Sequence, residues 1–150
     1  MAALVTLVVA CGGDNDGPAA TSVVTPTAPQ APGGGPGTIT VISSSPLNGQ
    51  NGRLILITAS PGAGGPPVAE ACVQIRSDGF TVPATTMTDK KADQAPCGSG
   101  AAKTTFPEGT YTITAGVYAP PAQAAEKEVK LDVKVAGNVT VQIDGKALSR

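Results

Sequence analysis

Residues 110–118 read TYTITAGVY, a run whose β-branched and aromatic side chains favour an extended strand. The next regular stretch, residues 126–135 (EKEVKLDVKV), alternates strictly. Val129, Leu131 and Val133 fall on one face of it, and charged side chains fall on the other. A period of two residues is typical of a strand with one buried face. The C-terminal part of the chain is therefore predicted to be β-structure.

The same pattern extends in both directions along the chain. It predicts strands at 38–43, 52–60, 68–77 and 139–143, and less regular strands at 80–88 and 103–106. Turn signals separate these runs, among them two Asn-Gly pairs within residues 46–52. No segment has a convincing helical period. About seven short strands with turns every 8–12 residues predict an all-β, antiparallel, seven-stranded sandwich over residues 38–150.

Residues 1–10 (MAALVTLVVA) are an apolar run that is too short to span a membrane, which takes about 20 residues as a helix. Such a run is typical of an export signal. The segment Val8-Val9-Ala10-Cys11 resembles the lipobox of bacterial lipoproteins. The resemblance implies cleavage before Cys11, lipid on its thiol, and a protein anchored outside the cytoplasm to a bacterial membrane. No Lys or Arg precedes Cys11, which indicates either a start codon further upstream or a weak signal.

Residues 11–37 are predicted to be a disordered linker. They carry only two charged side chains, Asp14 and Asp16, and are rich in Gly, Pro, Ala and Thr. Such a composition buries too little apolar surface to offset the entropy of an ordered chain. A flexible linker of about 26 residues has a root-mean-square reach of roughly 25–30 Å.

The chain has three cysteines, Cys11, Cys72 and Cys97. If Cys11 carries the lipid, the other two remain, and an exported protein meets conditions in which such a pair usually bonds. We expect a Cys72–Cys97 disulfide, with two free buried thiols as the alternative. If Ala71 and Val73 face the core, the alternation turns Cys72 outward. The bond would then pin the long loop before Cys97 onto the outer face of the sheet.

Composition excludes several functions. The 150 residues include no His, so His-based nucleophilic catalysis and His-ligated metals are excluded. A net charge of −1 argues against a nucleic-acid surface. We therefore expect no catalysis, no cofactor and no resident metal. The alternative is a ligand-binding module for a glycan, on Tyr118 and Phe80, or for Ca²⁺, at Asp89 and Asp93.

Three segments resemble the carboxypeptidase regulatory-like domain, a transthyretin-like (prealbumin-like, Ig-like) sandwich. They are EACVQI at residues 70–75, FPEGTYTI at residues 106–113 and NVTVQI at residues 138–143. The resemblance implies a domain without catalytic residues of its own, which acts as a structural or protein-interaction module. In the second segment we expect the Tyr111 ring in the core and its hydroxyl at the rim. The expected partner is another protein of the cell envelope.

Overall fold

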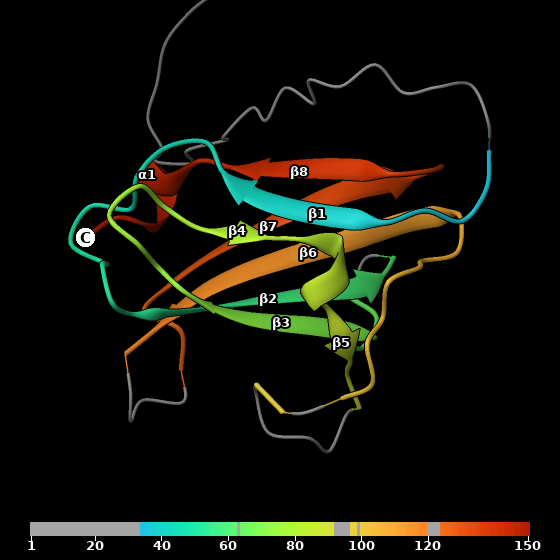
Figure 1. The fold of residues 1–150 in the computed structure, drawn as a ribbon, viewed down its shortest axis with the longest axis horizontal. Coiled ribbons are helices and arrows are strands. Elements are labelled where there is room, and N and C mark those ends of the chain that lie inside the picture. Colours follow the sequence, from blue (N-terminus) through green and yellow to red (C-terminus); the bar gives the residue numbers. More distant parts are fainter. Residues whose placement is uncertain (1–33, 63, 92–96, 99, 120–123) are drawn as a thin grey trace, which may run out of the picture.

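The computed structural model describes residues 34–62, 64–91, 97–98, 100–119 and 124–150. Cys11 and the predicted export signal lie outside the described residues. The described chain forms two facing layers of β-strands with one short helix at an end (Figure 1). The elements are β1 (Ile39–Ser43), β2 (Leu54–Pro61), β3 (Ala69–Gln74), β4 (Thr81–Val82), η1 (Ala84–Thr86), β5 (Thr88–Asp89), β6 (Gly109–Tyr118), β7 (Lys127–Val135), β8 (Val139–Ile143) and α1 (Gly145–Leu148).

The predicted all-β sandwich is confirmed, with two differences in its detail. One sheet has the strand order β4-β1-β8 and the other β5-β3-β2-β6-β7, so the described residues contain eight strands rather than seven. Every pairing is antiparallel except that of β1 with β8, which is parallel. These two strands run the same way because the chain enters both from one end of the sandwich. Residues 34–38 lead into β1 beside the turn that leads into β8.

The strand predicted over residues 80–88 is divided in two. Pro83 has no N–H to donate to a sheet, and the backbone after it turns into the 3-10 helix η1. β4, before the turn, pairs with β1 in the smaller sheet, whereas β5, after it, pairs with β3 in the larger one. This segment therefore crosses from one layer to the other, and Met87 between the two strands is fully buried.

One further expectation was wrong, and one element was not predicted. Residues 103–106 form no strand, because Phe106 makes only an isolated bridge with Gly37. Residues 145–148 form the helical turn α1, which the period of the strands did not indicate. Asp144 caps this turn by accepting a hydrogen bond from the Lys146 N–H at 3.0 Å. A glycine follows Asp144 because a Cβ at Gly145 would come within 2.1 Å of the Ser45 carbonyl oxygen.

The core lies between the two sheets and follows from the alternation of their strands. Inward-facing positions supply it, and the fully buried side chains include Ile39, Val41, Ile55, Ile57, Ile75, Met87, Phe106, Ile113, Ile143 and Leu148. The Tyr111 ring is also buried and meets the Phe106 ring edge to face, with centroids 5.5 Å apart. Its hydroxyl donates to the Pro107 carbonyl oxygen at 3.1 Å. The expected position of this tyrosine is confirmed.

The strand directions give the sandwich two distinct ends. We call the end that residues 34–38 join the base; β1 and β8 begin there and β7 ends there. We call the opposite end, formed by residues 44–53, 75–80, 124–126 and 144–150, the loop end. Figure 1 shows residues 34–38 and the C-terminus at opposite ends of the layers. Within the described part of the chain, no helix has the length and apolar character needed to cross a membrane.

Replacement of Tyr111 by Phe should lower the free energy of unfolding by about 1 kcal/mol, because the Pro107 carbonyl loses its part-buried donor. Urea denaturation measures the change. Tyr118→Phe is the matched control, since the structure gives the Tyr118 hydroxyl no hydrogen bond to a described residue, and it should leave the midpoint almost unchanged. Equal effects of the two variants would contradict the role given to the Tyr111 hydroxyl.

Candidate functional site

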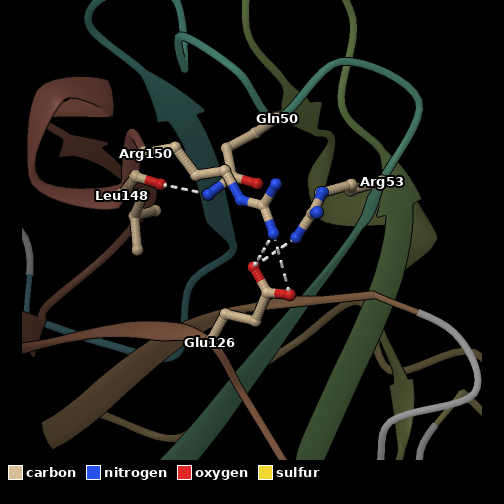
Figure 2. Close-up of polar contacts among 5 residues, drawn as sticks. All are labelled: Gln50, Arg53, Glu126, Leu148 and Arg150. Carbon is tan, nitrogen blue, oxygen red and sulfur yellow. Dashed lines mark hydrogen bonds and ion pairs between the residues drawn. The ribbon is translucent and has the colours of Figure 1, made fainter.

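Charged side chains from three separate segments meet at the loop end. Glu126, just before β7, accepts a hydrogen bond from Arg53, which precedes β2. The Nη2 atom of Arg150 lies 3.3 and 3.4 Å from the two oxygens of the same carboxylate. Figure 2 shows both guanidinium groups directed at Glu126. The three side chains form a cluster with one net positive charge, open to solvent on the Arg150 side.

A buried glutamine fixes the position of Arg150. The Gln50 side chain is fully buried, and its Nε2 atom donates to the Leu148 carbonyl oxygen at 2.9 Å (Figure 2). The Arg150 N–H in turn donates to the Asn48 carbonyl oxygen at 3.0 Å. Hydrogen bonds therefore connect the turn at 47–53 to the helix α1 and the residues after it, although about a hundred residues separate the two segments in sequence. The Oε1 atom of Gln50 has no hydrogen-bond partner among the described residues.

Two carboxylates of the loop end titrate below their ordinary range. Partial desolvation acts to raise the pKa of Glu126, but the hydrogen bond from Arg53 and the charges of Arg150 and Arg53 outweigh it. The pKa of Glu126 is lowered from its ordinary value of 4.5 as a result. The pKa of Asp144 is also lowered, first by the hydrogen bond from the Lys146 N–H and then by that from the Ser45 hydroxyl. Both groups are therefore charged at neutral pH.

A hollow of about 510 Å³ lies at the same end of the sandwich, along the margin between the two sheets. It is lined by Ser43, Val73, Gln74, Arg76, Asp78, Gly79, Phe80 and Thr81. The Arg53 carbonyl accepts a hydrogen bond from the Ile75 N–H at 2.8 Å. The segment before β2, which contains Arg53, therefore runs next to the segment after β3, which lines the hollow. Arg76 and Asp78 are exposed, and neither has an ion-pair partner among the described residues. Both charges are available to another molecule.

The structure joins Cys72 and Cys97 in a disulfide, with Cα atoms 5.4 Å apart. Ala71 is buried in the core, and the half-buried Cys72 lies on the opposite face of β3, as the alternation predicted. The bond therefore ties the loop at Cys97 to the outer face of the sheet. The buried Glu70 lies two residues before Cys72 on the same face, where its Oε1 atom accepts from the Gly98 N–H at 3.1 Å.

Glu70 also has a cationic partner. Its Oε2 atom lies 3.2 Å from the Nζ atom of Lys90, and both side chains are largely shielded from solvent. A buried charge is tolerated when it is paired and hydrogen-bonded. The disulfide and this ion pair therefore lie close together on the outer face of β3, two residues apart along the strand.

The residues named for the alternative ligands make other contacts or lie outside the described residues. Asp89 is paired with Lys103 at 3.2 Å, and Asp93 lies outside the described residues. Phe80 is buried, and the Tyr118 ring lies against Gly116. No group of three or more His, Cys, Asp or Glu able to hold a metal ion occurs within the described ranges.

Comparison with known proteins finds no similar family model, curated protein or solved structure. The resemblances to the lipobox and to the carboxypeptidase regulatory-like domain therefore stay predictions. The charged cluster and the hollow at the loop end are therefore interpreted from the side chains that form them.

Gln50 and Glu70 were not identified as buried residues from the sequence. Gln50 belongs to a run of turn residues, in which a polar side chain normally faces solvent. Glu70 has alanine on both sides, which gives some sign of a crowded site. Its burial depends on Gly98 and Lys90, which fold over it from elsewhere in the chain.

Removing the disulfide by Cys72→Ala with Cys97→Ala should lower the free energy of unfolding by about 3 kcal/mol, since the bond closes a loop of 25 residues. Urea denaturation of the wild type with and without a thiol reductant gives the comparison. Reductant should shift the wild type to the midpoint of the double variant and leave the double variant unchanged. A double variant as stable as the oxidised wild type would refute the bond's contribution.

Glu126→Gln should change how stability depends on pH. Because the folded pKa of Glu126 is lowered, its contribution is complete above the ordinary value of 4.5 and is lost as the pH falls through the folded pKa. The variant should therefore be less stable than the wild type at neutral pH, and the gap should close in acid. Urea midpoints over a pH series measure this gap. Asp78→Asn, which removes an unpaired carboxylate, is the control, and a Glu126→Gln gap that stays constant with pH would contradict the prediction.

Proposed function

We propose that this protein is a non-catalytic lipoprotein of the bacterial cell envelope. Residues 1–10 direct export, Cys11 carries the lipid, and residues 11–37 connect it to the β-sandwich at residues 38–150. The sandwich serves as a structural or protein-interaction module. The lipobox-like segment Val8-Val9-Ala10-Cys11 supports the anchor, and the two-ended arrangement of the sandwich supports its use for interaction.

The separation of the base from the loop end is the observation that carries this proposal. The N-terminal segment joins the sandwich at the base, where the Thr38 N–H donates to Asn138 Oδ1 at 3.1 Å. The charged cluster and the hollow lie at the other end. A lipid attached through residues 11–37 therefore leaves the loop end accessible to another protein.

The chemistry of the loop end fits a polar protein surface. Arg76 offers a planar donor group to a carboxylate or to backbone carbonyls, and Asp78 accepts from amides or hydroxyls. The cluster of Arg53, Glu126 and Arg150 adds a net positive charge nearby. We therefore propose an envelope protein with acidic side chains at its contact surface as the partner.

The alternative function, binding of a glycan or Ca²⁺, has less support. Asp89 already pairs with Lys103, and a buried Phe80 offers no flat face to a sugar ring. Saturating Ca²⁺ should raise the melting temperature of the protein if this alternative holds.

The test uses the full chain expressed in a bacterial cell, with a photo-cross-linking amino acid at position 76. Mass spectrometry of the mature protein should find an acylated N-terminal Cys11. The chain should fractionate with membranes, and illumination should yield a discrete adduct with one envelope protein. The same amino acid at position 110, exposed near the base, is the control and should yield no such adduct.

Cys11→Ser separates the two parts of the proposal. This variant should lose the lipid and leave the membrane fraction. An unprocessed, unacylated wild-type chain that keeps Met1 would refute the anchor. An acylated chain that cross-links equally from positions 76 and 110 would refute the loop end as the contact surface while leaving the anchor intact.

A further inference from the structure

β7 forms a long open edge of the larger sheet (Figure 1). It spans nine residues and pairs along its whole length with β6. None of the described strands pairs with its other side. The opposite edge of the sheet is β5, which has only two residues. A long unpaired edge presents a row of backbone N–H and C=O groups that can hydrogen-bond to another strand.

The two faces of β7 differ sharply. Glu128, Lys130, Asp132 and Lys134 are exposed on the outer face. On the inner face Val129, Leu131 and Val133 pack against the core but are only partly buried. A strand added along this edge would therefore cover apolar surface as well as satisfy backbone groups.

The order of the side chains along β7 makes the strand complementary to itself. In an antiparallel pair of two β7 strands centred on Leu131, Lys130 lies opposite Asp132 of the second copy, and Glu128 lies opposite Lys134. On the inner face Val129 lies opposite Val133, and the two Leu131 side chains meet. Opposite charges facing each other across strands stabilise a pair, and like charges destabilise it.

Other registers lack this match. Centring the pair on Val129 sets Glu126 against Asp132, two like charges, whereas centring it on Val133 leaves Lys130 opposite Ala136. A shift by one residue would turn the charged face of one copy toward the apolar face of the other. Only the register centred on Leu131 pairs every charged side chain from 128 to 134 with an opposite charge.

We propose that two copies of this protein associate through β7, antiparallel and centred on Leu131, so that their larger sheets become one continuous sheet. The present outer-face contacts are exposed and of low energy, so they give way at little cost. They are the ion pair of Lys130 with Glu128 at 3.1 Å and the hydrogen bond from the Thr112 hydroxyl to Asp132 at 2.7 Å.

The pairing is compatible with two lipid anchors in one membrane. A two-fold axis through Leu131 sets the bases of the two copies at opposite ends of the joined sheet. The predicted linker, with a root-mean-square reach of roughly 25–30 Å, allows each N-terminus to meet the membrane beside the pair.

Charge reversal tests the proposal, in the full chain carrying Cys11→Ser so that lipid does not drive association. Sedimentation equilibrium should give a dimer for this protein, and Asp132→Lys should weaken it by about tenfold or more, because Lys130 then faces a lysine. The double variant Lys130→Asp with Asp132→Lys restores opposite charges and should restore the dimer. Glu108→Lys, which makes the same change of charge at an exposed position outside the strands, should leave association unaltered.

Mixing supplies the decisive comparison. Lys130→Asp and Asp132→Lys should each self-associate about tenfold or more weakly than the parent when alone, and should form a heterodimer when combined, since every facing pair is then opposite in charge. The double variant also loses the Thr112 contact, so its recovery excludes a defect in folding. A monomeric parent protein at its highest soluble concentration, an Asp132→Lys protein that still dimerises like the parent, or a mixture that stays monomeric would each overturn the proposal.

Discussion

Burial of the alternating apolar side chains of β2 is the constraint on which the rest of the structure depends. This strand is central in the larger sheet, paired with β3 on one side and β6 on the other. Ile55, Ile57 and Ala59 are fully buried against the smaller sheet. Because the side-chain period is two, these contacts fix which face of β3, β6 and β7 turns inward. They thereby decide that Cys72 faces outward and that the charges of β7 lie at the surface.

Local alternation was enough to predict the main strands. The predicted strand at 139–143 agrees with β8 to the residue, and those at 110–118 and 126–135 agree with β6 and β7 to within one residue. The sequence was less informative where neighbours decide the structure. The division at Pro83 arises because the residues before it pair with β1 in one sheet and the residues after it pair with β3 in the other. The parallel pairing of β1 with β8 arises because the chain enters both strands from the same end of the sandwich.

The candidate site was also only partly predictable from the sequence, because it combines residues that are distant in the chain. Cysteine arithmetic predicted the Cys72–Cys97 pair, because few alternatives exist for two thiols. The cluster at the loop end was not foreseen, since Arg53, Glu126 and Arg150 are far apart in the chain and belong to no local motif. Gln50, which holds the C-terminal segment beside them, appears in the sequence as an ordinary turn residue. Such residues become recognisable only when the topology brings the turns together.

The parallel pairing of β1 and β8 has a mechanical consequence. A pull on the N-terminal segment acts along the axis of β1, away from the base, while a partner held at the loop end would resist it. The hydrogen bonds between β1 and β8 would then be loaded in shear, all at the same time, instead of being peeled apart one by one. A domain connected in this way resists extension better than one whose first strand lies at right angles to the applied force.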